Sequence, residues 1–429
     1  MIGLIVVFFI AAPAVVLYTA GYRYNWQLHR FDQAGVLSVD IEPLDAHVFI
    51  DAHRIPKELP IRLTTMIPGT YTLRMEAKNK KTWEKDIVIE SKKTTYIKNI
   101  TLFEDASPAL FMPEKETITS FSSSVQGQEL FLMTRIGTST YEGTIVQTDT
   151  KKTAPIGRYV SDKLPHVLWS SQAPFIAVQT RQNGIARIEI IDAEHALVLG
   201  EHTFSATINH LPMQWSLQSG TPMLYVEDGV KIKKILERTV EQFAVIPSNT
   251  LWHVDTIGDL WLFDEFHHTL SPAEHPTDIV SVANGQTVLS IIDINTSRAI
   301  FETTQGIIVR DASDGTEQTL PASFFFFNPV RNEWIAWSLW ELWTIYDNGG
   351  VALLNRVSEK TAQVLPLDEY GVLLLATDTS LTAFNPGYYV SQLLLSAEKI
   401  EHIALNQETR TIFFLGTIGG ARGIFSLAF

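Results

Sequence analysis

The feature that most constrains the fold of this chain is a short unit that recurs between residues 118 and 429. Each copy consists of an apolar run, a polar turn and a second apolar run that ends in Asp or Asn. The copies occupy residues 130–149, 168–199, 326–354, 369–385 and 400–429. Short apolar runs with little helical periodicity, separated by turn residues, predict β-strands. A recurring unit of this kind favours architectures that stack similar units side by side.

A four-stranded unit cannot bury both of its faces alone, so stacking the units around an axis is the natural solution. Propeller blades run about 40–45 residues. Residues 118–429 therefore predict a β-propeller of about seven blades, with six or eight as alternatives. A tandem of β-sandwiches is the second choice, because the repeat is shorter than the roughly 100 residues of such a domain. The segment resembles WD-repeat propellers in architecture only, since no Gly-His and Trp-Asp signature recurs, and this resemblance transfers no function.

Tryptophan is frequent in the same region, and large aromatic side chains dominate burial between packed sheets. We expect inter-blade packing by the following residues: Trp169, Trp215, Trp252, Trp261, Trp334, Trp337, Trp340 and Trp343. The C-terminal residues 424–429 alternate large apolar side chains with Ser426 and Ala428. This alternation predicts a paired strand that closes the ring, because a closed ring leaves only short protected edges.

The first 22 residues contain no charged side chain, and Arg23 is the first charge on the chain. A helix of that length spans roughly 30 Å of hydrocarbon. Residues 1–22 therefore predict a transmembrane anchor, with Tyr18, Tyr22, Tyr24 and Trp26 as an interfacial aromatic belt. A cleaved signal peptide is the alternative, but the segment lacks a basic leader. The few basic residues that follow favour a cytoplasmic body by the positive-inside rule.

Composition and charge exclude several function classes. The chain has no cysteine, which removes thiolate catalysis, iron–sulfur clusters and cysteine-ligated zinc. The net charge is −14. Residues 21–117 and 118–238 are each balanced, whereas residues 239–429 hold 8 Lys and Arg against 22 Asp and Glu. A nucleic-acid partner would require a basic stripe, so none is expected. We interpret the acidic third as a solubility feature.

Residues 35–103 read as a separate strand-rich module. Residues 35–42 alternate apolar and polar side chains, as strands with one buried face do. Pro68 and Gly69 predict a turn between two further strands, with a positive φ at Gly69. The module contains about six short strands in roughly seventy residues, which predicts a small β-sandwich.

This module resembles the PEGA domain family. The resemblance is carried by Gly35, Pro43, Ala46, Val48, Ile50, Asp51, Pro60, Leu63, Pro68, Gly69, Tyr71 and Leu73. The chain departs from the family at Leu44 and Asp45, at Ala52, and at Asn79 and Lys80, with Trp83 as the expected aromatic. The resemblance implies a spacer or interaction module, usually extracytoplasmic and next to a membrane. It is the reason why we expect the body of the protein outside the cytoplasm.

Candidate ligand-binding residues are few. The densest polar cluster comprises Asp264, Glu265, His267 and His268, followed by Glu274 and His275. Carboxylate and imidazole groups at such spacing suit a metal, but the stretch contains proline and we favour a solvated loop. Four aspartates end predicted strands, where Asp often bonds the local backbone: Asp149, Asp192, Asp293 and Asp347. Basic turns at 78–81 and 92–93 suit anionic lipid or wall polymer, but we favour solvated hairpin tips.

No Gly-x-Ser-x-Gly elbow and no phosphate loop occur in the sequence. We therefore assign no catalytic, cofactor-binding or metal-binding residue and expect no cofactor. The domains expected are an anchor at 1–22, linkers at 23–34 and 104–117, the PEGA-like module at 35–103 and the propeller at 118–429. Together they predict a monomeric, membrane-anchored, extracytoplasmic binding or scaffold protein of the bacterial envelope, with an envelope protein or glycan as ligand. The alternative is an envelope hydrolase, lyase or dehydrogenase with its site in the propeller channel.

Overall fold

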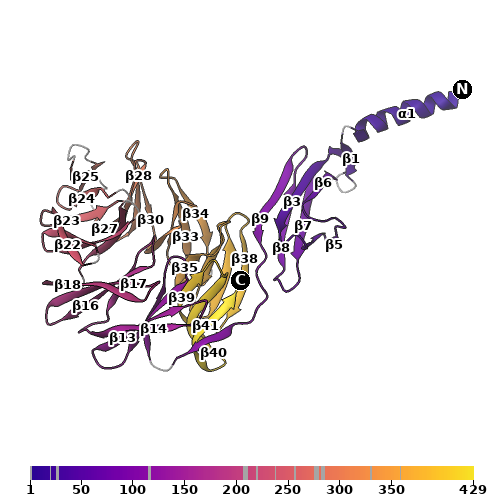
Figure 1. Ribbon diagram of the computed structural model, residues 1–429. Coiled ribbons are helices and arrows are strands. Elements are labelled where there is room, and N and C mark those ends of the chain that lie inside the picture. Colours follow the sequence, from indigo (N-terminus) through magenta and orange to yellow (C-terminus); the bar gives the residue numbers. More distant parts are fainter. Residues whose placement is uncertain are drawn as a thin grey trace. The chain divides into compact units, whose positions relative to one another are not determined.

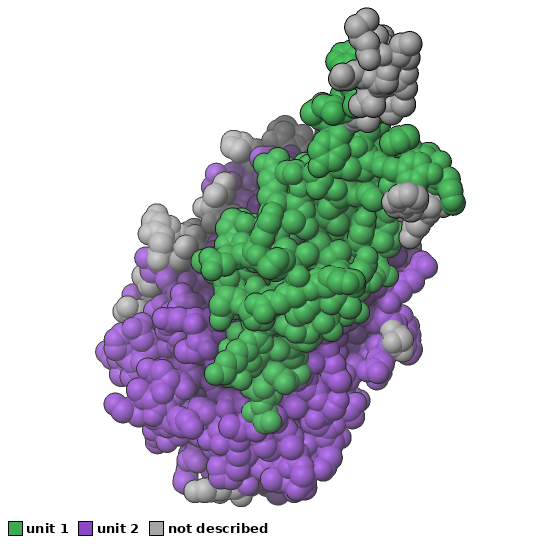
Figure 2. Space-filling model, turned by 90° about the vertical axis from the view of Figure 1, so that its right-hand side faces the viewer, with its two compact units in different colours: residues 1–107, 429 green, residues 108–428 purple. Residues whose placement is uncertain are grey.

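The computed structural model describes two compact units. It covers residues 2–19, 21–25, 29–114, 117–205, 211–218, 221–236, 238–255, 258–274, 280–281, 286–328, 331–357 and 359–429. The first unit contains residues 1–107 and Phe429, and the second contains residues 108–428 (Figure 2).

The first unit begins with one helix, α1 (Ile2–Thr19), followed by a hairpin of β1 (Tyr22–Asn25) and β2 (Arg30–Gln33). Among the described residues, no helix is long and apolar enough to cross a membrane. Trp26 of the predicted aromatic belt lies outside the described residues.

The PEGA-like segment forms two sheets within the fully described residues 35–101. Its strands are β3 (Gly35–Glu42), β4 (His47–Ile50), β5 (His53–Arg54), β6 (Ile61–Met66), β7 (Gly69–Glu76), β8 (Trp83–Ile89) and β9 (Thr94–Thr101). One sheet has the order β6-β3-β9, in which β3 and β9 are parallel, and the other has the order β5-β4-β7-β8. Side chains alternate between buried and less buried along β3 and β8, so each strand has one apolar face, as the sequence predicts.

Two turns of this module differ: one begins at Pro43, and the other is the turn predicted at Pro68 and Gly69. Pro43 begins a turn in which the Ala46 amide donates to its carbonyl at 3.0 Å. Gly69, however, is the first residue of β7 and has no positive φ. The prediction of a left-handed conformation at Gly69 is wrong, because the chain enters the strand there and the Tyr71 hydroxyl bonds the Ile67 carbonyl at 2.7 Å.

The second unit consists of four-stranded antiparallel sheets, which we number as blades 1–8 in chain order (Figure 1). Blade 1 comprises β11 (Ile118–Ser123), β12 (Glu129–Arg135), β13 (Thr140–Gln147) and β14 (Thr153–Val160), and blade 2 comprises β15 (His166–Trp169), β16 (Phe175–Gln182), β17 (Ile185–Asp192) and β18 (Leu197–Ser205). Blade 3 comprises β19 (Met213–Gln218), β20 (Thr221–Asp228), β21 (Lys231–Leu236) and β22 (Thr239–Val245), and blade 4 comprises β23 (Thr250–Val254), β24 (Leu260–Asp264), β25 (Thr269–Pro272) and β26 (Val280–Ser281).

Blades 5 to 8 continue the pattern. Blade 5 comprises β27 (Val288–Ile294), β28 (Arg298–Thr303), β29 (Gly306–Asp311) and β30 (Glu317–Leu320), and blade 6 comprises β31 (Phe324–Asn328), β32 (Glu333–Trp337), β33 (Glu341–Tyr346) and β34 (Val351–Arg356). Blade 7 comprises β35 (Gln363–Pro366), β36 (Leu373–Ala376), β37 (Ser380–Asn385) and β38 (Val390–Ser396), and blade 8 comprises β39 (Lys399–Asn406), β40 (Thr411–Ile418) and β41 (Ala421–Ala428) with β10 (Ala109–Pro113). The described residues thus form a β-propeller with eight such sheets, one more than the seven expected and one of the alternatives.

The last blade joins the two ends of the propeller. Its outer strand, β10, pairs with the C-terminal strand β41, so that Leu110 lies opposite Phe425. Residues 109–113 were expected to be a linker, but they complete a sheet whose other three strands lie about 300 residues later. The predicted pairing of the C-terminal strand is confirmed, because β41 also pairs with β40, and Phe425 and Leu427 are buried.

The hydrophobic core lies between neighbouring blades. One cluster joins Phe131 of blade 1 to Ile176 of blade 2, and equivalent clusters join each blade to the next as far as blade 7. A further cluster joins Leu130 of blade 1 to Phe413 of blade 8, so the first and last blades also pack together. These shared cores account for the fold physically, because each sheet buries its two faces against its neighbours.

Candidate functional site

The first strand of every blade lies at one edge of its sheet. Two cavities are lined by these edge strands from several blades at once, so the edges converge on a central channel. The larger cavity, of about 520 Å³, is lined by residues of blades 2 to 6: His166, Leu211, Pro212, Met213, Gln214, Glu227, Leu251, Trp252, His253, Leu289, Ser290, Ile291, Ile292 and Phe325. The smaller cavity, of about 360 Å³, is lined by residues of blades 1, 6, 7 and 8: Phe121, Ser122, Ser123, Ser124, Val125, Phe326, Phe327, Gln363, Leu365, Pro366, Ile403, Ala404, Leu405 and Gln407.

The two cavities lie toward opposite ends of the channel. The larger one includes His166 and Met213, which are the first residues of β15 and β19. The smaller one spans β35 from Gln363 to Pro366 and extends past the ends of β11 and β39 to Val125 and Gln407. Because the first strands of successive blades run in the same direction along a propeller axis, strand beginnings and strand ends mark its two mouths.

Charged side chains are scarce along the channel. The eight innermost strands contain three Asp, Glu, Lys or Arg residues, namely Asp293, Lys399 and Glu401. All three are ion-paired: Asp293 contacts Arg298 at 2.8 Å, and Glu401 contacts both Lys399 and Arg422. The channel is therefore lined mainly by neutral groups.

Four consecutive phenylalanines, Phe324 to Phe327, form most of β31, the innermost strand of blade 6. Two tryptophans of β32 contact them from the two faces of the sheet. The ring of Trp337 stacks on Phe324 with centroids 5.5 Å apart, and it also contacts Phe326 at 6.1 Å. The ring of Trp334 lies 5.9 Å from Phe325 and 5.4 Å from Phe327. We call these six residues the aromatic platform.

The aromatic platform keeps accessible surface. Phe324 is 43% exposed and Phe327 is 39% exposed. Phe325 lines the larger cavity, whereas Phe326 and Phe327 line the smaller one. The platform is therefore the part of the wall that the two cavities share.

His253 is a titratable group of the larger cavity, and its side chain is buried at 7% exposure. The Gln214 amide nitrogen lies 3.3 Å from its Nδ1, and the same amide donates to the Val254 carbonyl at 2.7 Å. Burial lowers the pKa of His253, against the opposing effect of the Asp293 and Asp255 carboxylates. Burial thus favours the neutral form of this imidazole.

Tryptophans fix the channel wall by hydrogen bonds between blades. Trp169 donates to the Ser122 hydroxyl at 2.9 Å, Trp215 to the Leu168 carbonyl at 3.1 Å, and Trp252 to the Glu227 carboxylate at 2.6 Å. The remaining predicted tryptophans contact the inter-blade clusters, namely Trp261, Trp334, Trp337 and Trp343. Trp340 is the exception, since its side chain is more than half exposed.

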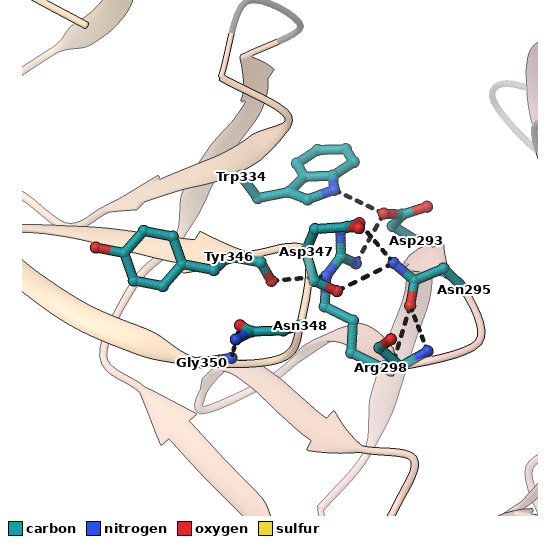
Figure 3. Close-up of polar contacts among 9 residues, drawn as sticks. Asp293, Asn295, Arg298, Trp334, Tyr346, Asp347, Asn348 and Gly350 are labelled. Carbon is teal, nitrogen blue, oxygen red and sulfur yellow. Dashed lines mark hydrogen bonds and ion pairs between the residues drawn. The ribbon is translucent and has the colours of Figure 1, made fainter.

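Blades 5 and 6 are joined by a polar clamp around Arg298 (Figure 3). Arg298 is 1% exposed. Its Nη1 donates to Asp293 at 2.8 Å, its Nε donates to the Tyr346 carbonyl at 3.1 Å, and its Nη2 lies 3.8 Å from Asp347. The Trp334 indole also donates to Asp293 at 2.7 Å. The arrangement neutralises Asp293 and links two blades.

The predicted polar cluster at 264–268 is a hairpin tip between β24 and β25. Asp264 accepts hydrogen bonds from the Phe266 and His267 amides at 2.8 and 2.9 Å, and it contacts the His267 ring at 2.8 Å. Nearby His275 lies outside the described residues. Within the part of the chain that the structure describes, no group of three His, Asp or Glu side chains is arranged to hold a metal.

The other aspartates and the basic turns also have structural partners. Asp149 accepts from the Thr150 amide, and Asp192 accepts from the His195 amide, in the local pattern expected of such residues. Asp293 and Asp347 belong to the Arg298 clamp. In the basic turns, ion pairs join Lys80 to Glu104, Lys81 to Asp105 and Lys93 to Glu90.

Sequence reasoning missed the aromatic platform. Phe326 and Phe327 begin the recurring unit at 326–354, but the run of four phenylalanines was given no functional role. Its position before a Trp-rich strand was the available signal, since large aromatic residues on paired strands contact one another. What it could not reveal is that β31 lies at the channel, because that depends on the closed ring.

Comparisons with known proteins assign the chain to no family. No protein-family model matches the sequence, and no curated protein does either. The PEGA resemblance therefore has no support from a family match. Among solved structures, the chain is similar to Sqt1 of Saccharomyces cerevisiae, with 9% identity, a TM-score of 0.48 and coverage of 76% of this chain and 99% of that one. It is also similar to the AfRom2 CNH domain, with 10% identity, a TM-score of 0.43 and coverage of 75% of this chain and 99% of that one. The similarity to the dihydro-heme d1 dehydrogenase NirN has 12% identity, a TM-score of 0.47 and coverage of 72% of this chain and 73% of that one.

Proposed function

We propose that the protein is a binding or scaffold protein of the bacterial cell envelope that recognises its ligand in the central channel of the propeller. The observation that carries this proposal is the aromatic platform, which leaves phenylalanine surface accessible beside two cavities. Ligand pockets are mostly apolar and aromatic, with a few polar groups that fix orientation. Exposed aromatic surface that is fixed in place favours binding, because little conformational freedom is lost when a ligand covers it.

A capture experiment tests this function. The full chain, purified in mild detergent, is used as bait against solubilised envelope. Ser123→Arg places a bulky charge in the smaller cavity, and Thr138→Arg places the same charge on an exposed loop outside the channel. We expect wild type and Thr138→Arg to retain the same envelope molecules and Ser123→Arg to lose them. Equal capture by all three would place recognition outside the channel.

Membrane attachment and an extracytoplasmic body are part of the proposal. Their support is the uncharged sequence before Arg23 and the resemblance of residues 35–103 to PEGA domains, which implies a spacer. Removing residues 1–22 should release the protein from the membrane fraction, and protease added to intact cells should degrade residues 35–429. Full membrane partition of the truncated chain, or protection of the body while a surface protein is cleaved, would contradict the respective part.

An envelope enzyme remains the second candidate, on one specific observation. His166, His253 and Glu227 line the same cavity, and imidazole and carboxylate groups are the usual agents of proton transfer. Turnover that disappears in His166→Gln would favour this candidate. The Trp252 indole and Gln214 amide already bond Glu227 and His253, so a structural role for these two groups is the simpler reading.

A further inference from the structure

The aromatic platform has the properties of a stacking surface. Its phenylalanines come from one strand and form two pairs on opposite faces of the sheet. Phe325 and Phe327 lie against Trp334, and Phe324 and Phe326 lie against Trp337, at centroid distances of 5.4 to 6.1 Å. Aromatic rings carry partial negative charge on their faces. Such faces attract the weakly positive C–H groups of a pyranose ring as well as simple apolar surface.

The charges of the channel restrict the ligand further. Asp293, Lys399 and Glu401 are already compensated by ion pairs. Burying an ionised ligand without a counter-charge is costly. The Glu227 carboxylate, which lines the larger cavity and accepts the Trp252 indole N–H, repels anions as well, so the channel disfavours uronates and phosphates.

Neutral polar groups argue against a wholly apolar ligand. Gln363 and Gln407 line the smaller cavity beside Phe326 and Phe327. Each amide donates one hydrogen bond to a backbone carbonyl, of Ile403 at 3.4 Å and of Pro366 at 3.1 Å. A side-chain amide offers two N–H donors and a carbonyl oxygen, so both keep capacity for a ligand. An apolar ligand would displace water from these groups without replacing its hydrogen bonds.

The placement of the cavities indicates an elongated ligand. Phe325 lines the larger cavity and the next two phenylalanines line the smaller one, toward opposite ends of the channel. A molecule that covers the platform therefore extends along β31.

We infer that the ligand is an uncharged oligosaccharide whose sugar rings stack along the aromatic platform while its hydroxyl groups bond the glutamine side chains. This inference rests on the proposed binding function. An uncharged extended peptide is the competing ligand, and the experiment separates the two.

Isothermal titration calorimetry of the full chain in detergent uses four probes: maltohexaose, cellohexaose, chitohexaose and, as the charged comparison, tetragalacturonate. We expect at least one neutral hexaose to bind and tetragalacturonate not to bind. Phe327→Leu keeps an apolar side chain but removes the ring face, and should weaken binding about 3- to 10-fold. Phe327→Tyr keeps the ring and should stay within about twofold of wild type.

Phe266→Leu is the matched control, because Phe266 is 86% exposed at the tip between β24 and β25, outside both cavities. It should leave affinity unchanged. If Phe327→Leu melts early, saturation-transfer difference NMR on wild type replaces it, with transfer from aromatic protons to pyranose C–H protons as the expected result.

Three results would overturn the inference. They are no binding of any neutral hexaose, equal binding of tetragalacturonate, and equal affinity of folded Phe327→Leu and wild type. If the Ser123→Arg-sensitive capture from envelope still occurs and yields an uncharged peptide, the binding function stands and the oligosaccharide is wrong. If capture does not depend on Ser123, the binding function itself fails.

Discussion

Replacing Arg298 by alanine should destabilise the propeller more than any exposed arginine does. The guanidinium is almost fully buried and contacts Asp293, the Tyr346 carbonyl and Asp347, so one side chain joins blades 5 and 6. After the change, Asp293 keeps the indole N–H of Trp334 as its bond within the clamp. A carboxylate that loses its cation in a largely buried site is costly.

The magnitude follows from burial. Removing one partner of a buried ion pair costs about 3–5 kcal/mol. The Asp293 side chain retains 19% exposure, so water partly compensates and we expect the lower end, about 3 kcal/mol. At about 2 °C per kcal/mol for a large unit, the melting temperature should fall by roughly 6 °C.

Arg356→Ala is the matched control. Arg356 forms a similar contact with Glu341 at 3.1 Å, but its side chain is 75% exposed, and exposed pairs contribute about 0–1 kcal/mol. Thermal unfolding of both variants, followed by circular dichroism, measures the difference. Arg298→Met, which keeps the apolar stem, separates lost charge from lost packing. If Arg298→Ala melts no lower than Arg356→Ala, the clamp does not stabilise the blade interface and the reasoning is wrong.

Three further predictions concern closure and pH. Gly127 has φ +72°, and a Cβ there would lie 1.7 Å from the Leu405 carbonyl oxygen of blade 8. Gly127→Ala should therefore lower the free energy of unfolding, measured with denaturant, by more than about 1 kcal/mol. Gly157→Ala should leave it nearly unchanged, because a Cβ at Gly157 meets open space. Deleting residues 424–429 removes most of β41, which pairs with both β10 and β40, so the cooperative melt of residues 108–428 should be lost; local fraying alone would contradict a closed ring. Burial lowers the pKa of His253 below 6.5, so its contribution to stability is complete above pH 6.5 and is lost as the pH falls toward the folded pKa. The melting temperature of His253→Gln should therefore fall less than that of wild type between about pH 7 and pH 5. Equal dependence of the two melting temperatures on pH would exclude this role.

The sequence predicted those features of the fold that are determined by residues close together along the chain. The alternation of apolar and polar side chains predicted strands in the PEGA-like module, and the repeated apolar runs predicted the four-stranded units of the propeller. Local rules also explained the hairpin tip at 264–268, where Asp264 bonds the next amides rather than a metal. Gly69 shows the limit of such rules, because the same Pro-Gly pair is compatible with a strand start.

What the sequence alone determined is therefore the all-β class and the repeating unit, since both follow from side-chain patterns a few residues long. The closed ring was decided by tertiary structure: β10 and β41 pair across some 300 residues, and no local pattern in 109–113 specifies that partner. The clamp on Arg298 and the channel position of β31 were decided in the same way. Each depends on which blade lies next to which, and burial of the two faces of every sheet, rather than any single segment, fixes that arrangement.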